Sequence, residues 1–220
     1  MNTPALAMAA SAVLAALAFS SAPAGAHPHA WVDQETAAVF GADGRIERVR
    51  VSWHFDEAYT AFIVQDTDAD GDGAADSDAL ARMAEETLQR LAEFGYFAEA
   101  WADEAEIGWS SAIDPAAAVT EDRLRLDFTL VLARPVDPVA ESFVYAVFDP
   151  TYWIEMRHPD AAAATVENAP EGAGCETRLD VPDPDEEWVA LASLLDSTQT
   201  AGDDLGIHFA DRVAVTCDAS

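Results

Sequence analysis

Two histidines, His27 and His29, flank a proline directly after an alanine-rich stretch of the chain. Imidazole nitrogens are good ligands for Zn²⁺, Ni²⁺ and Cu²⁺. Pro28 has no amide hydrogen to lose, so the tail cannot form a square-planar chelate through deprotonated backbone nitrogens. The imidazoles therefore need partners from elsewhere in the fold, and Asp56 and Glu57, at the end of an expected strand, are candidates. The pattern predicts a transition-metal site made of these four side chains; the alternative is a frayed terminus with inert histidines.

A second group of metal-ligand residues alternates through an acidic, glycine-rich loop. EF-hand calcium loops take oxygen ligands from positions 1, 3, 5 and 9, a backbone carbonyl from position 7, a glycine at position 6 and usually a glutamate at position 12. The ligand positions are filled by Asp68, Asp70, Asp72, Ala74 (through its carbonyl) and Asp76, with Gly73 at position 6. Position 12 is Ala79, which has no side-chain oxygen, so weak or absent Ca²⁺ binding is predicted. The alternative is an acidic loop that is only solvated.

Motifs of the common catalytic classes are missing from the sequence. It has no G-x-S-x-G, no H-E-x-x-H and no glycine-rich phosphate loop. His158 and His208 are isolated, and each is more typical of a surface or hydrogen-bonded histidine than of a catalytic base. Adjacent pairs of acidic residues are so frequent in this chain that no single pair indicates a catalytic site. The sequence therefore predicts a protein without catalytic residues, and not an enzyme.

The first 26 residues carry no charged side chain, and Leu6 to Phe19 is an apolar stretch. This stretch is short for a membrane span, which needs about 20 apolar residues. It is followed by Ala24-Gly25-Ala26, an A-x-A site for signal peptidase. We therefore predict a secretory signal peptide over 1–26 and a single exported domain over 27–220, with His27 as the first residue after cleavage. An apolar N-terminal helix of the mature protein is the alternative.

The chain is strongly acidic, with 41 Asp+Glu against 11 basic residues, all of them Arg, and a formal net charge of −30. Nucleic-acid binding is excluded because the neutralisation of phosphates needs clustered basic residues. The charge also argues against docking on anionic lipid. Half of the residues are hydrophobic, so the chain has the apolar content of a folded protein. No apolar run after the signal approaches about 18 residues, so no membrane insertion of the mature chain is expected.

Two cysteines, Cys175 and Cys217, are the only ones in the sequence, and both lie in the part expected to be exported. An oxidising compartment favours a disulfide between them. The alternative is two free thiols.

The elements that must position these residues follow from the hydrophobic pattern. Residues 30–40 and a following run with alternating apolar residues at 49–55 predict a hairpin around a glycine turn at 41–44. Further strands are predicted over 124–132, 143–148 and 212–217, with the first of them broken at 134–138. One helix is predicted from a cap at Ser77 or Asp76 to an end at Gly95, and a second over 183–195, with Asp183 as N-cap and Pro184 at its first position. The fold class is α+β: a mainly antiparallel β-sheet with two helices packed on it and one disulfide.

Several short motifs in this order resemble domain-of-unknown-function family 1007. They are His27-Pro28-His29-x-Trp31 after the signal, Trp53-x-Phe55-Asp56-Glu57, the Asp/Gly loop before a helix ending in Gly95-Tyr96-Phe97, Asp149-Pro150-Thr151-Tyr152, and the late cysteines with Phe209-Ala210. The resemblance implies a periplasmic component of an uncharacterised transport system, often encoded beside nickel/cobalt-type permeases and tied to zinc acquisition. It implies metal binding at His27 and His29 directly. Ala79 departs from such loops, which often carry Glu there.

The expected function is a periplasmic accessory protein that binds a divalent transition metal, Zn²⁺ or Ni²⁺/Co²⁺, and serves a membrane permease. The alternative is a non-catalytic structural or protein-interaction module with a weak calcium-binding loop.

Overall fold

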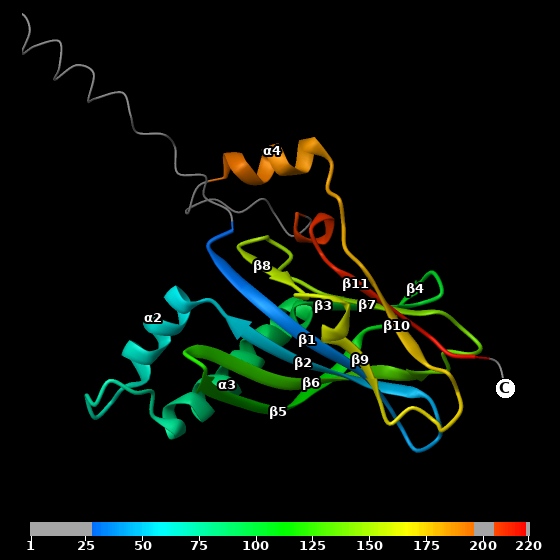
Figure 1. Ribbon diagram of the computed structural model, residues 1–220, viewed down its shortest axis with the longest axis horizontal. Coiled ribbons are helices and arrows are strands. Elements are labelled where there is room, and N and C mark those ends of the chain that lie inside the picture. Colours follow the sequence, from blue (N-terminus) through cyan, green and yellow to red (C-terminus); the bar gives the residue numbers. More distant parts are fainter. Residues whose placement is uncertain (1–27, 196–204, 219–220) are drawn as a thin grey trace, which may run out of the picture.

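The computed structural model describes residues 28–195 and 205–218, which form two β-sheets with three α-helices around them (Figure 1). Sheet A has the strand order β5-β6-β2-β1-β8, with β9 also paired to β1, and sheet B has the order β10-β11-β7-β3-β4. The strands are β1 (Ala30–Phe40), β2 (Ile46–Phe55), β3 (Ala98–Ala102), β4 (Ala105–Glu106), β5 (Trp109–Thr120), β6 (Arg123–Val136), β7 (Phe143–Val147), β8 (Ile154–Arg157), β9 (Ala164–Glu167), β10 (Glu176–Asp180) and β11 (Arg212–Thr216). The α+β class is confirmed, although two sheets take the place of the single one expected. The predicted signal peptide over 1–26 and His27 lie outside the described residues.

The predicted hairpin is present as β1 and β2. The register pairs Val32 with Phe55 and Ala38 with Val49, so these apolar side chains share the buried face of sheet A. Side chains point alternately to the two faces of a strand. The polar residues Arg50, Ser52 and His54 of β2 therefore lie on the opposite, outer face of sheet A.

Strand β6 is longer than the sequence pattern predicts. Its alternating leucines and Phe128 are buried as expected, but it continues through Pro135 to Val136, where a break was predicted. The register shifts between the pairs Arg48↔Val131 and Ile46↔Val136. Pro135 lies within that irregular stretch, and because proline has no amide hydrogen, a position without regular pairing suits it.

Helix α2 (Glu57–Thr67) is an element that the sequence pattern did not indicate. It buries Thr60, Ile63 and Thr67 but exposes Phe62. The Thr60 hydroxyl donates to the carbonyl of Asp56 at 2.8 Å and accepts from the amide of Leu124 at 2.9 Å. Buried threonines that form hydrogen bonds replace the apolar stripe that normally reveals a helix.

Helix α3 (Ser77–Leu91) confirms the predicted amphipathic helix, with Leu80, Ala84, Leu88 and Leu91 buried. It ends at Leu91 rather than at Gly95, and a 3-10 segment η2 (Ala92–Phe97) follows. The helix packs on β5 of sheet A, and its buried residues belong to the same hydrophobic cluster as both sheets. The two sheets and α3 therefore share one core.

Helix α4 (Glu186–Leu194) confirms the second predicted helix but begins later. The N-cap is Asp185, not Asp183, so Pro184 precedes the cap and does not occupy the first helical position. The ring of Trp188 stacks on that of His208, with centroids 3.7 Å apart. His208 belongs to a short 3-10 turn, η4 (Gly206–His208), so this stacking holds α4 against the segment that leads into β11.

Replacement of Gly206 by alanine is expected to lower the free energy of unfolding by about 1–3 kcal/mol. A Cβ atom at this position would lie 1.9 Å from the carbonyl oxygen of Asp149, and the amide of Gly206 donates to Pro150 O at 2.8 Å. The backbone must therefore move to admit a methyl group. The matched control is Gly108→Ala, because no atom lies within 4 Å of a Cβ there. Equal melting temperatures for the two variants would contradict the close approach.

Candidate metal-binding site

The acidic loop joins two helices. Asp68 follows α2 directly and Asp76 precedes α3, so the loop has the helix–loop–helix setting of a calcium loop (Figure 1). The amide of Asp76 donates to the carbonyl of Thr67 at 3.0 Å, and its Oδ2 accepts from the amide of Ala69 at 2.8 Å. Asp76 therefore closes the two ends of the loop on each other.

Asp68 organises the first half of the loop through its carboxylate. Its Oδ1 accepts from the amides of Gly71 at 2.8 Å and Asp72 at 3.0 Å, and its Oδ2 accepts from Gly73 at 3.0 Å. Gly71 and Gly73 have φ values of +78° and +88°, in the left-handed region where glycine is favoured. The two glycines thus allow the chain to turn around the carboxylate of Asp68.

Three predicted ligands converge in this loop. One carboxylate oxygen from each of Asp68, Asp70 and Asp72 lies within 4.8 Å of the other two, and no other group of three or more metal-ligand side chains is this close in the described part of the chain. Asp70 Oδ1 accepts from the amide of Asp72 at 3.1 Å, and Asp72 Oδ1 accepts from that of Ala74 at 2.8 Å. The loop backbone thus fixes the positions of these side chains before any ligand binds.

The chemistry of this donor set suits a hard divalent cation. Ca²⁺ and Mg²⁺ prefer carboxylate and carbonyl oxygens, whereas Zn²⁺ sites in proteins are built mostly from Cys and His. Three carboxylates held this close repel one another, and a divalent cation removes that repulsion. Position 12, Ala79, supplies no side-chain ligand, so any remaining ligands must be carbonyls, other residues or water.

His29 lies where β1 begins. Its amide donates to the carbonyl of Trp153 at 2.8 Å, and the two rings lie with centroids 4.0 Å apart and planes inclined at 37°. The side chain is half-buried. The ring of Trp153 therefore helps to orient this histidine.

Asp56 directly follows β2, at the strand end that was expected, and it is also the N-cap of α2. Its Oδ1 accepts from the amides of Ala58 and Tyr59 at 2.8 and 2.9 Å, and its Oδ2 accepts from Trp31 at 3.0 Å. Burial alone raises the pKa of Asp56, but the hydrogen bonds from Trp31, Tyr59 and Ala58 and the charge of Arg123 outweigh it and hold the pKa below its ordinary value. The carboxylate is thus ionised and already accepts three hydrogen bonds.

Glu57 occupies the first turn of α2 and is exposed. With Ala74 and Asp122 it lines a hollow of about 720 Å³ between α2 and the acidic loop. Because Asp56 bonds to Trp31, the structure brings His29, Asp56 and Glu57 to the same end of sheet A. Among the residues described, their donor atoms do not form a group as close as the three aspartates. The transition-metal site stays a prediction.

A buried polar network between the two sheets was not found by sequence reasoning. The imidazole of His158 contacts Asp211 Oδ2 through Nδ1 at 3.1 Å and Thr36 Oγ1 through Nε2 at 2.9 Å, and Thr36 Oγ1 lies 2.8 Å from the hydroxyl of Tyr145. The imidazole of His158 thus links Asp211 to Thr36, and Thr36 in turn links it to Tyr145. Burial raises the pKa of Tyr145, which keeps its hydroxyl protonated. The His158 side chain is 1% exposed, so this network joins the sheets and does not line an open site.

No helix in residues 28–195 and 205–218 is long and apolar enough to cross a bilayer.

Comparison with known proteins gives a family and one distant relative. The chain is 24% identical over 196 residues to a protein of Haemophilus influenzae (strain ATCC 51907 / DSM 11121 / KW20 / Rd) described as uncharacterized, covering 88% of this chain and 92% of the relative. No solved structure is similar enough to match. The model of the family described as "Protein of unknown function (DUF1007)" matches residues 12–217, nearly the whole sequence. The chain belongs to the DUF1007 family.

Proposed function

We propose that this chain is an exported, non-catalytic accessory protein that binds a divalent cation and serves a membrane permease. The observation that carries the proposal is the cluster of Asp68, Asp70 and Asp72, whose carboxylates are oriented by the backbone of a loop between two helices. Oxygen ligands at alternate positions, a glycine at the sixth position and a helix on each side are the features of a calcium loop. The bound ion in this loop is Ca²⁺ or a similar hard cation.

Export is supported by two features of the chain. Cys175 and Cys217 form a disulfide, and disulfides persist mainly in oxidising compartments such as the periplasm. The sequence pattern over 1–26 is that of a cleaved signal peptide. The permease partner rests on the resemblance to the family alone.

A second candidate function is the binding of Zn²⁺ or Ni²⁺/Co²⁺ by His27 and His29 with Asp56 and Glu57. The observation that favours it is the placement of His29, Asp56 and Glu57 at one end of sheet A. In this site the metal and three backbone amides share the carboxylate oxygens of Asp56. In this function the metal is the cargo, which the protein passes to the permease.

Calorimetric titration of metal-stripped protein, purified after export, tests both sites. We expect Ca²⁺ binding that weakens at least about tenfold in Asp70→Asn or Asp72→Asn, because each change removes one ionised ligand. Asp183→Asn is the matched control, since it removes the same charge at an exposed position outside the loop. Zn²⁺ binding, in turn, is expected to fall in the double variant His27→Ala/His29→Ala and to stay unchanged in the loop variants.

Unchanged Ca²⁺ affinity in both loop variants would show that the acidic loop is not the site. Unchanged Zn²⁺ affinity in the histidine variant would remove the second candidate. The two outcomes are independent, so the calorimetry separates the two candidate cations.

A further inference from the structure

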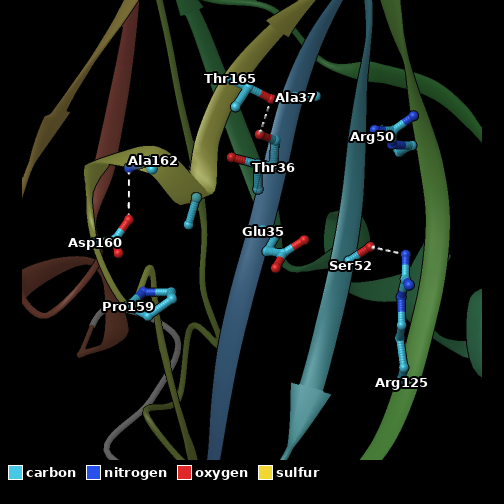
Figure 2. Close-up of a pocket in the computed structure, with 11 residues that line it drawn as sticks. Glu35, Thr36, Ala37, Arg50, Ser52, Arg125, Pro159, Asp160, Ala162 and Thr165 are labelled. Atoms are coloured by element: carbon cyan, nitrogen blue, oxygen red, sulfur yellow. Dashed lines mark hydrogen bonds between the residues drawn. The ribbon is translucent and has the colours of Figure 1, made fainter. Parts of the chain in front are cut away.

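A polar pocket of about 330 Å³ lies on the outer face of sheet A, and none of its lining residues belongs to the acidic loop (Figure 2). Its floor is β1 around Glu35, one wall is β2 and β6, and the other is the turn over 159–163 that leads into β9. We call it the sheet A pocket.

Small side chains create this hollow. Ser52 of β2 and Ala37 of β1 are shorter than the other side chains that line the pocket on these strands. Ala162 and Ala163 of the turn are also short and leave space between the turn and the sheet. Asp160 Oδ1 accepts from the amide of Ala162 at 2.8 Å, which fixes the turn in the short 3-10 segment η3 (Ala161–Ala163). The pocket is therefore built by ordered elements on both sides.

One side of the sheet A pocket is cationic. The register places five of the chain's eleven arginines on the outer face of sheet A, although the whole chain carries a net charge of −30. Two of them, Arg50 and Arg125, line the pocket (Figure 2). Arg125 is oriented by Asp127 at 2.9 Å and by the hydroxyl of Ser52 at 3.2 Å, and Arg50 by an ion pair with Glu167. Both side chains are about half exposed, which leaves guanidinium N–H groups available for a ligand.

The floor of the sheet A pocket, on β1, is anionic. The Glu35 side chain is 62% exposed, and its nearest basic partner among the described residues is His54, whose Nε2 lies 4.0 Å from Oε1. Neither Arg50 nor Arg125 comes within ion-pairing distance of Glu35 in this part of the chain. Glu35 thus has no guanidinium to neutralise it, while each arginine is anchored by a carboxylate outside the pocket.

From this division of charge we propose that the sheet A pocket binds a small zwitterion of the amino-acid class, either a free amino acid or a short peptide. The ligand ammonium group lies on the side of Glu35, and its carboxylate accepts N–H groups from Arg50 and Arg125. Arginine and carboxylate form strong, charge-assisted hydrogen bonds of defined geometry. A simple anion is repelled by the field of a protein with this net charge, whereas a zwitterion is not. The volume is at the small end of ligand pockets, which suits a ligand of this size.

Calorimetry with protein purified after export tests the proposal, with the twenty standard amino acids and glycylglycine as probes and acetate and methylamine as single-charge controls. We expect at least one zwitterion to bind saturably with a Kd of about 1 mM or lower, and both single-charge probes to bind at least about tenfold more weakly. Glu35→Gln and Arg50→Gln should each weaken binding about tenfold or more. Arg125→Gln serves as a second cationic variant and should also weaken binding, because Arg125 is the other guanidinium that lines the pocket.

Arg178→Gln is the control, because Arg178 is exposed on β10 of sheet B and pairs with Asp180. It should leave the affinity unchanged, and the melting temperatures of all variants should show that each one is folded. Absence of saturable binding for every zwitterion up to about 10 mM would overturn the proposal. Binding of acetate as tight as that of the amino acids, or full affinity in Glu35→Gln, would overturn it too, since the pocket would then select anions only.

Discussion

Replacing Cys175 and Cys217 together by serine is expected to lower the free energy of unfolding by about 4 kcal/mol. The two cysteines are 42 residues apart in the sequence, and their disulfide limits the conformations of that long loop in the unfolded chain. This magnitude comes from the loop length in the chain-entropy treatment. It is a large fraction of the stability of an ordinary domain, which is about 5–15 kcal/mol.

The position of the disulfide explains which part of the fold depends on it. Cys175 directly precedes β10, and Cys217 directly follows β11, next to the terminal strand pair Glu176↔Thr216. Strand β10 is an edge strand of sheet B, paired only with β11 among the described residues. Loss of the disulfide should therefore unfold β10 before β11, because β11 is paired on both sides, with β10 and with β7.

Urea denaturation of the wild type and the double serine variant, each with and without a phosphine reductant, measures this effect. The reductant should destabilise the wild type to the level of the variant and leave the variant unchanged. A wild type that keeps its midpoint after complete reduction, verified by mass spectrometry of alkylated thiols, would contradict the predicted contribution.

Local sequence patterns were enough to predict the central part of sheet A and of sheet B. Strand β2 and the leucines of β6 alternate with period two, and β7 is a short run that is apolar on both faces. The acidic loop was also predictable, because its aspartates are neighbours in sequence and backbone amides of the same loop donate to their carboxylates.

Elements that lack a hydrophobic pattern of their own and depend on distant partners were not predicted. Helix α2 buries Thr60 because its hydroxyl bonds to Leu124, which lies 64 residues away. Strands β8 and β9 are only four residues long and pair in parallel with β1, more than a hundred residues earlier in the chain. Parallel pairing over such a separation leaves no local pattern to read.

Some features of the candidate sites were not predicted either, because they depend on contacts between residues that are distant in the sequence. Asp56 lies at the expected strand end, but it also caps a helix that was not predicted, so three backbone amides already donate to the carboxylate that the metal hypothesis uses. The sheet A pocket joins residues from β1, β2, β6 and the turn over 159–163, which only the sheet topology brings together. Spacing in the sequence finds sites within one loop, and it does not find sites made by pairing of strands.

Replacing Asp211 by alanine is expected to lower the free energy of unfolding by about 3 kcal/mol, because buried donors lose their acceptor. Asp211 Oδ2 accepts from the backbone amide of His158 at 2.7 Å and contacts its Nδ1 at 3.1 Å, and the Asp211 side chain is 4% exposed. The imidazole of His158 keeps Thr36 as a hydrogen-bond partner through Nε2. The backbone amide has no such alternative and is left buried without a partner.

Chemical denaturation separates the members of this network by the size of their effects. Tyr145→Phe removes one neutral hydrogen bond to Thr36 and should cost about 1 kcal/mol, clearly less than Asp211→Ala. Asp211→Asn keeps an oxygen for the amide of His158, so its effect should fall between the two. Asp180→Ala is the matched control, because its side chain is 47% exposed and should change stability by less than about 0.5 kcal/mol. An Asp211→Ala variant that is no more destabilised than Asp180→Ala would contradict this prediction. The amide of His158 would then have another acceptor, and Asp211 would not be the group that joins the end of β8 to sheet B.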